Sequence, residues 1–183
     1  MGIFSGCKSP LELIKSYGTT YEFSKEMPPE SEILKILEAG AWAQSPMNIQ
    51  PWKFILIKDG KIISSLMGCV LYGFLHEKPQ LIIALALDMG KVGARRPYGK
   101  GKAGHDDSLI SLGVAALLMD SQAKSMGIGC AMLTPVAKRA HKIIGLAKNE
   151  KCFLMLALGY GKKGSFVPNR QRNGIGKVVD YRQ

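Results

Sequence analysis

The chain has 183 residues, 46% of them apolar, and its 25 basic and 14 acidic residues give a formal net charge of +11. This length and composition favour one domain, 1–183, with a substantial core. No apolar run approaches the length that spans a bilayer, and the N-terminus lacks the layout of a signal peptide. The four cysteines are scattered without zinc-ligand spacing, which predicts reduced thiols, no metal site and a cytoplasmic location.

The first half of the chain predicts helices and strands in alternation. A short helix is expected over residues 10–17 and a clearer one over 30–43, where Ile33, Leu34, Leu37 and Ala41 recur at helical spacing. Residues 54–57 predict a buried strand, and the apolar positions from 62 onward fit a helix that ends at Gly73. Residues 81–87 predict a second strand, because the run is too short and too continuous for an amphipathic helix.

The second half begins with a segment rich in glycine and basic residues, 88–105, which we expect to be a mobile loop without regular structure. The longest helix is predicted over 107–126, with Asp107 or Ser108 as N-cap and Gly127 as the stop. Thr134 and Pro135 predict the start of a basic helix that ends at Gly145. Residues 153–158 predict a third strand, and residues 174–181 could supply a terminal strand.

Two familiar motifs fail on their context. Gly159, Gly161 and Gly164 spell the dinucleotide-binding pattern directly after a strand, but the segment that follows has no helical period and so presents no helix N-terminus to a pyrophosphate. No histidine lies beside a cysteine or serine in a nucleophile arrangement. Paired carboxylates for acid-base chemistry would have to be Asp106 and Asp107, which more plausibly cap a helix.

The polar loop at 43–52 is the most informative segment of the chain. It reads Ala-Gln-Ser-Pro-Met-Asn-Ile-Gln-Pro-Trp and lies between a predicted helix and a predicted buried strand. Loops held by rigid elements are where functional groups are positioned. Ser45, Asn48 and Gln50 offer neutral donors and acceptors, which suit the edge of a heteroaromatic ring better than a metal ion. This pattern indicates a bound cofactor.

The same ten residues resemble the Ala-Pro-Ser-x-x-Asn-x-Gln-Pro-Trp signature of the nitroreductase-like flavoproteins, which use flavin mononucleotide (FMN). Further matches follow in order: an Ala-rich helix ending at 124–129, the strand at 153–159, and a late basic pair at 170 and 172. The resemblance implies an α+β fold with a central, mostly antiparallel sheet flanked by helices. It also implies a domain-swapped homodimer with two flavin sites at its interface. A face of Ala115, Ala116 and Ala123 agrees with close helix contact there, although core packing predicts the same pattern.

The resemblance also assigns site residues. Ser45, Pro46 and Asn48 would line the flavin from the partner subunit, and the backbone at Leu133 and Thr134 would lie near the reactive edge of its ring. Two arginines match the basic-x-basic element that binds the FMN phosphate. The full set of positions assigned to the cofactor is Tyr17, Thr19, Tyr21, Gln44, Ser45, Pro46, Asn48, Gln50, Leu133, Thr134, Arg170 and Arg172.

The chain departs from the family at its first motif, normally Arg-Arg-Ser-x-Arg or Arg-His-Ser-x-Lys. Tyr17, Gly18 and Tyr21 stand where cations are usual, and Thr19 keeps the hydroxyl. Tyr21 can donate a hydrogen bond but supplies no positive charge to the flavin. Losing one charge-assisted hydrogen bond costs about 1.5 to 3 kcal/mol, so we expect weakened FMN binding.

The activity that the resemblance implies is an FMN-dependent oxidoreductase. Hydride would pass from NAD(P)H through the flavin to a nitroaromatic, quinone or similar small-molecule acceptor by a ping-pong mechanism. The alternative is a flavin-binding or nucleic-acid-associated protein of the same fold without reductase activity. Nucleic acid is the weaker partner, because the basic residues are not interleaved with stacking aromatics. The basic segment from Lys91 to Lys102 could be a lid that meets the donor's phosphates or simply a solvated loop.

Overall fold

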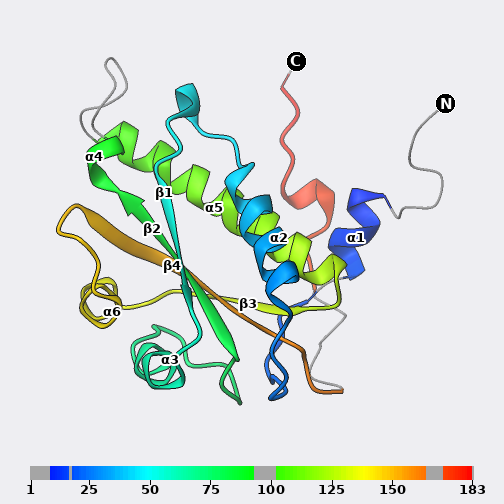
Figure 1. Ribbon diagram of the computed structural model, residues 1–183. Helices are drawn as coiled ribbons and strands as arrows, with labels where there is room; N and C mark the ends of the chain where they lie inside the picture. The colour runs from blue at the N-terminus through cyan, green and yellow to red at the C-terminus, as the bar shows by residue number, and fades with distance from the viewer. Residues whose placement is uncertain (1–8, 17, 93–101, 164–170, 183) are drawn as a thin grey trace.

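The computed structural model describes residues 9–16, 18–92, 102–163 and 171–182 of the chain. A four-stranded antiparallel sheet lies at its centre, with strand order β1-β2-β4-β3. Helices α2 (Glu30–Ala41) and α5 (Lys102–Ser125) cover one face of this sheet, and α3 (Gly60–Met67) and α6 (Ala137–Ile144) cover the other (Figure 1). This three-layer arrangement confirms the predicted α+β class with a central antiparallel sheet.

Strand β2 (Leu81–Asp88) is the centre of the sheet. It pairs with β1 (Trp52–Ile57) on one side and with β4 (Glu150–Gly159) on the other, and β4 in turn pairs with β3 (Gly129–Leu133). All seven residues of β2 from 81 to 87 are fully buried. Antiparallel strands usually alternate between buried and exposed side chains, but here both faces are covered. The continuous apolar run therefore predicted the strand correctly.

Two hydrophobic clusters lie on either side of the sheet. The first joins β2 and β4 to α2 and α5, and its buried members are Ile33, Ile36, Leu81, Ile83, Leu85, Leu87, Leu112, Ala116, Met119, Ala123, Ile128, Cys130, Leu156 and Leu158. The second packs the opposite side chains of the same strands against α3 and α6, and includes Ile63, Leu66 and Ala140. The predicted inner face of the long helix is confirmed. Leu34, which the helical spacing placed inward on α2, is 55% exposed.

Helices α2 and α5 approach each other closely at Gly40. A Cβ atom at this position would lie 2.1 Å from Met119 Cε and 2.8 Å from Met119 Cγ. Met119 is fully buried, so its side chain has little room to move away. The absence of a side chain at Gly40 therefore sets the spacing of the helix layer.

The long helix begins earlier than predicted. Residues 88–105 were expected to lack regular structure, but the structure shows a short helix α4 (Met89–Val92) and places the first residues of α5 in this segment. Asp107 and Ser108 lie inside α5 and are not its N-cap; Ser108 Oγ donates to the Gly104 carbonyl. Helical packing against the sheet overrides the glycine content of this segment. Gly127, with a φ of 77°, ends the helical region as predicted.

The boundaries of other helices also differ from the predicted ones. Helix α3 ends at Met67 rather than Gly73 and is capped by Asp59, whose side chain accepts from the backbone N–H groups of Lys61 and Ile62. Helix α6 follows Val136 as its N-cap, so Thr134 is not the cap, and Gly145 ends it in the left-handed conformation as predicted. Strand β3 was not predicted, because its five residues are too few to show a period.

The C-terminal segment was expected to contain a strand over 174–181. Among residues 171–182 the structure instead shows one turn of 3-10 helix, η2 (Ile175–Lys177), and every residue there is exposed. Ile175, Val178 and Tyr181 are 74%, 64% and 84% exposed. Strand formation needs a partner edge, and within the described residues this segment pairs with none. Among the described helices, none has both the length and the apolar character to cross a membrane.

Candidate functional site

The polar loop forms a strained turn. Residues Pro46–Asn48 make one turn of 3-10 helix, η1, between α2 and β1. Met47, Asn48 and Gln50 have positive φ values of 51°, 54° and 47°, a region that non-glycine residues seldom adopt. Such residues cost about 1 to 3 kcal/mol each and are concentrated at ligand sites. The strain therefore makes this loop a candidate ligand site on grounds independent of its residue types.

Hydrogen bonds hold this strained loop in place. Ser45 Oγ accepts from the backbone N–H of Gln50 at 3.0 Å, and Gln50 Nε2 donates to Asn48 Oδ1 at 3.1 Å. The Asn48 N–H donates to the Ser45 carbonyl at 3.0 Å. The hydroxyl of Ser45 thus spans the turn, while the side chains of Asn48 and Gln50 stay exposed to solvent.

Two grooves border η1. One of about 530 Å³ is lined by residues from the end of α2 and from the loop: Ala41, Trp42, Ala43, Gln44, Ser45, Asn48 and Gln50. The other, of about 360 Å³, separates the loop from α5 and is lined on the helix side by Asp107, Ile110, Ser111 and Val114. Trp42 is 79% exposed, which is unusual for so large an apolar side chain. No motif in the sequence singles it out, although it directly precedes the polar loop.

The described residues of the first motif, 18–21, line neither of these grooves. The Thr20 N–H donates to the Cys130 carbonyl on β3, and Phe23 forms an isolated bridge with Gly161 after β4. Tyr21 is half-buried and packs edge-on against Phe74, with the ring centroids 5.8 Å apart. Thr19 is also half-buried. Tyr17 lies outside the described residues.

The remaining predicted positions are also dispersed. Leu133 is buried at the end of β3, and the Thr134 carbonyl accepts from the Leu71 N–H at 2.8 Å, which fixes the backbone between β3 and α6. Arg172 is exposed, and its Nη1 donates to the carbonyl of the neighbouring Gln171. Arg170 lies outside the described residues.

Strand register shows that one chain does not bring these groups together. η1 directly precedes β1, whose Trp52 pairs with Leu87 near the end of β2. Thr20, by contrast, contacts Cys130 on β3. Cys130 pairs with Leu158 of β4, which lies beside the start of β2. These places are at opposite ends and opposite edges of the sheet, roughly 25 Å apart by strand geometry. A site that uses both regions therefore needs a second chain, and the assignment of the site residues stays a prediction.

The described thiols are unsuited to nucleophilic chemistry. Cys69, Cys130 and Cys152 are free and buried. Burial raises the pKa of Cys152 to about 12, and burial together with the nearby Asp120 carboxylate raises the pKa of Cys130. A thiol with a raised pKa supplies little thiolate at neutral pH. Cys7 lies outside the described residues.

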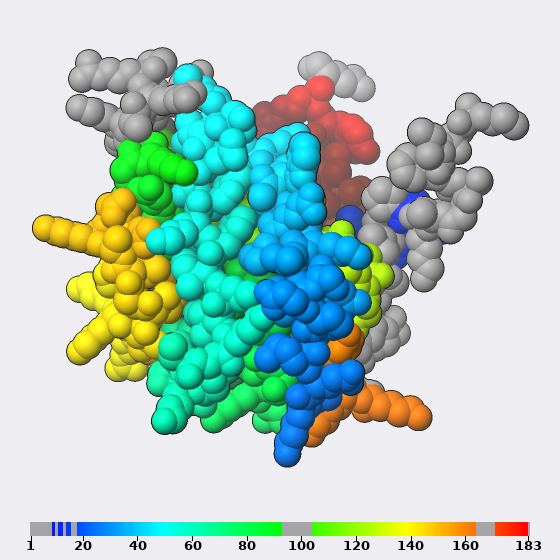
Figure 2. Space-filling model, viewed as in Figure 1, coloured from blue at the N-terminus to red at the C-terminus, as the bar shows by residue number. Residues whose placement is uncertain are grey.

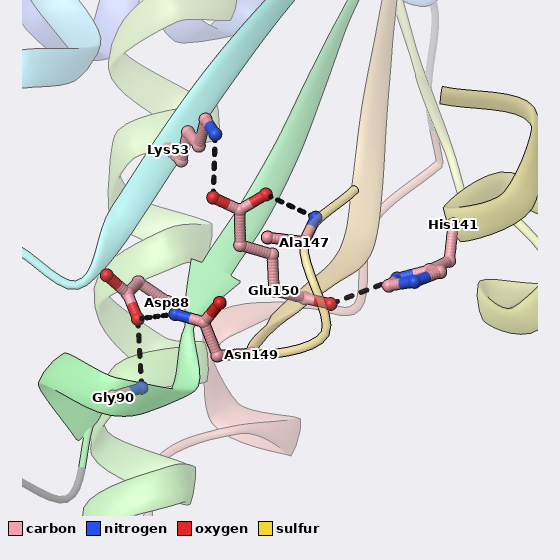
Figure 3. A network of polar contacts seen from close by, with 7 residues as sticks. All are labelled: Lys53, Asp88, Gly90, His141, Ala147, Asn149 and Glu150. Carbon is pink, nitrogen blue, oxygen red and sulfur yellow. Dashed lines mark hydrogen bonds and ion pairs between the residues drawn. The ribbon is translucent and has the colours of Figure 1, made fainter. Parts of the chain in front are cut away.

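A polar network joins the ends of three adjacent strands (Figure 3). Lys53 Nζ on β1 lies 2.6 Å from Glu150 Oε1 on β4, and Glu150 Oε2 accepts from the Ala147 N–H at 3.1 Å. Asp88 Oδ1 at the end of β2 accepts from Asn149 Nδ2 and from the Gly90 N–H. The hydrogen bond from Lys53 lowers the pKa of Glu150, and the bond from Ala147 acts in the same direction.

This network makes stability depend on pH. Glu150 is 8% exposed and has a lowered pKa in the folded state, so its carboxylate stabilises the fold above the ordinary glutamate pKa of about 4.3. We expect Glu150→Gln to reduce the free energy of unfolding by about 1 to 2 kcal/mol at pH 7. The difference from the wild type should shrink as the pH falls below about 4, because the wild type then loses the same charge. Urea unfolding at several pH values measures this, with Glu38→Gln on exposed α2 surface as the control.

An outward apolar stripe runs along α5. Ile110 and Leu117 are 67% and 51% exposed, Leu118 is 37% exposed, and Val114 lies between them at helical spacing. Ala115, Ala116 and Ala123, by contrast, are fully buried in the chain's own core. The alanine face thus packs in the core of its own chain, whereas the neighbouring stripe is exposed. Exposed apolar patches of this kind mark interaction sites.

Comparison with known proteins agrees with the fold and the loop. The family model described as "Nitroreductase family" matches residues 14–81. Iodotyrosine deiodinase from Drosophila melanogaster is 20% identical over 205 residues, covering 96% of this chain and 70% of that protein. A protein from Archaeoglobus fulgidus described as an NADH dehydrogenase/NAD(P)H nitroreductase is 24% identical over 157 residues, covering 83% of this chain and 85% of that protein.

A solved structure shows the same architecture. A Desulfovibrio desulfuricans protein described as a nitroreductase in complex with FMN superposes with a TM-score of 0.79 at 20% identity, covering 97% of this chain and 99% of that one. At this identity the likeness establishes the fold alone. The matched segment 14–81 includes α2, η1 and β1, which are the elements that form and hold the strained polar loop. The chain therefore has the fold of this nitroreductase structure, and its residues 14–81 match the nitroreductase family model.

Proposed function

We propose that the chain is an FMN-dependent oxidoreductase that acts as a homodimer. The observation that supports this most is the strained η1 loop, which holds neutral amide groups of Asn48 and Gln50 beside an open groove of about 530 Å³. Pockets of this volume accommodate cofactors. Neutral donors and acceptors fit the edge of a flavin ring, and the sequence match and the FMN-bound relative agree with that ligand.

In this proposal the chain binds and orients FMN and excludes water from it. Gln44, Ser45, Pro46, Asn48 and Gln50 of one subunit would contact the ring, and Leu133 and Thr134 of the other would lie near its reactive edge. Arg172, which forms no ion pair with any residue in the described part of the chain, would bind the phosphate together with Arg170.

FMN, when bound, supplies hydride chemistry at its ring, accepting from NAD(P)H and donating to a nitroaromatic, quinone or similar acceptor in a ping-pong sequence. The exposed Trp42 beside the loop offers an aromatic surface at the groove. This chemistry requires no acid-base side chain from the protein.

The direct test is to purify the protein, add FMN, and measure the visible flavin spectrum and NAD(P)H oxidation with and without acceptor. We expect stoichiometric flavin binding and acceptor-dependent oxidation with parallel double-reciprocal plots. The absence of bound flavin at saturating FMN would refute the proposal. Flavin binding without turnover would instead favour the alternative, a flavin-binding protein without reductase activity. Iodotyrosine belongs in the acceptor panel because of the deiodinase relative.

The unusual first motif gives a second prediction. If Tyr21 occupies a position where a cation normally contacts FMN, Tyr21→Lys should tighten FMN binding about tenfold, because it restores one charge-assisted hydrogen bond. Isothermal titration calorimetry measures the change. Tyr181→Lys adds the same charge at an exposed position and should leave the affinity unchanged, and Tyr21→Phe separates the added charge from the lost hydroxyl. Equal affinity of Tyr21→Lys and wild type would remove Tyr21 from the site.

A further inference from the structure

A third groove lies beside the start of β4, at the same end of the sheet as η1 but two strands away from β1. Its volume is about 460 Å³, and it is lined by His105 of α5, by residues of α6, and by the start of β4: Ala137, Lys138, His141, Lys148, Glu150, Lys151 and Phe153. In the space-filling view α6 and the start of β4 lie at the left, whereas the segment containing η1 lies at the top (Figure 2). No predicted flavin residue lines this groove.

The groove arises because β3, the strand beside β4, is shorter than β4. β3 pairs with β4 only from Met155 to Gly159, so within the described residues no strand covers the outer edge of β4 from Glu150 to Phe153. An open edge exposes backbone donors and acceptors. His141 Nδ1 lies 3.1 Å from the Glu150 carbonyl oxygen, so this imidazole satisfies one of the edge groups from α6. Because a carbonyl can only accept, Nδ1 carries the hydrogen of this bond.

The groove is strongly cationic. Lys138, Lys148 and Lys151 are exposed, and none of them forms an ion pair with any described residue. Glu150 is the only acidic residue among those that line it, and both of its carboxylate oxygens are already occupied by Lys53 and the Ala147 N–H. Three unneutralised ammonium groups around one hollow raise the local concentration of anions.

The remaining wall is aromatic and apolar. Phe153 is half-buried against the core, and the His105 ring meets it edge-on at a centroid distance of 5.6 Å. Ala137 adds a methyl group to the lining. A flat apolar surface bordered by lysines matches a planar aromatic ring bearing one negative charge better than it matches a bare inorganic anion.

We propose that this groove, at the open edge of β4, is a binding site for a small aromatic carboxylate. The ring lies against Phe153 and His105, and the carboxylate meets the ammonium groups of Lys148 and Lys151. The site belongs to a single chain and does not depend on FMN, so it does not rest on the proposed function.

The test uses flavin-free protein and 4-fluorobenzoate observed by 19F NMR. We expect saturable binding of 4-fluorobenzoate, and markedly weaker binding of 4-fluorobenzamide, which has the same ring without the charge. Lys148→Gln combined with Lys151→Gln should weaken 4-fluorobenzoate binding about tenfold or more. The matched control is Lys35→Gln combined with Lys61→Gln, which removes the same charge from exposed positions on α2 and α3 and should leave the affinity unchanged.

A separate variant tests the aromatic wall. Phe153→Leu keeps an apolar side chain and should weaken 4-fluorobenzoate binding while leaving the circular dichroism spectrum intact. Equal binding of the acid and the amide, equal loss in the groove and control variants, or complete displacement by an equal concentration of inorganic phosphate would each overturn the proposal. Binding that persists unchanged in all variants would place the probe elsewhere and would also overturn it.

Discussion

Ile110→Glu combined with Leu117→Glu should convert the proposed dimer to a folded monomer and abolish measurable FMN binding. Both side chains are exposed on the outward stripe of α5, and Ile110 also lines the groove beside η1. Burying each in an interface is worth about 1.5 to 3 kcal/mol, and burying an unpaired carboxylate costs several more. The dimer dissociation constant should therefore rise by roughly three decades or more.

Sedimentation equilibrium and flavin absorbance on the same samples measure this result. Ile62→Glu on α3, which is 37% exposed on the opposite side of the sheet, is the matched control and should remain dimeric and yellow. Thermal unfolding must show that the α5 variant is folded. A monomeric variant that retains full FMN affinity would refute a site shared between subunits, and an unchanged dimer would refute the interface.

Arg172→Gln should weaken FMN binding by about 1.5 to 3 kcal/mol and leave riboflavin binding unchanged. The two ligands differ only in the phosphate, so the comparison isolates the contact that this side chain is proposed to make. Arg172 is exposed, and its Nη1 donates to the carbonyl of the neighbouring Gln171, so its replacement should not disturb the fold.

Arg182→Gln is the matched control for this experiment. Arg182 lies in the same C-terminal segment but pairs with Asp180 at 2.9 Å. Fluorescence titration of FMN and of riboflavin with each variant gives four affinities. An equal loss for FMN and riboflavin would show that Arg172 acts through the ring or through the fold rather than through the phosphate.

The sequence predicted the fold well wherever a long apolar pattern was present. The continuous run at 81–87 identified the central strand, and the inner face of the long helix was correct because Leu112, Ala116, Met119 and Ala123 follow helical spacing. Strand β3 was missed because five residues between two turns show no period. The start of α5 was misplaced because glycines at its beginning suggest a loop, whereas packing on the sheet stabilises a helix.

The candidate site was only partly accessible from sequence. The residue types in the 43–52 loop indicated a cofactor, but the positive φ values of Met47, Asn48 and Gln50 appear only in three dimensions. Likewise, the groove beside β4 arises from the length difference between β3 and β4, and its lysines are distant in sequence from His105. Tertiary placement, rather than local pattern, decides both features.

The wide separation of η1 from the first-motif segment has a genetic consequence. In a symmetric pair, each composite site would take one region from each polypeptide, so any substitution appears in both sites at once. Mixing two differently damaged chains, one altered at Asn48 and the other at Tyr21, would place both lesions in one site of the hybrid and leave its second site wholly unaltered. Partial activity could then return from two inactive parents, a form of complementation that a protein with self-contained sites cannot display.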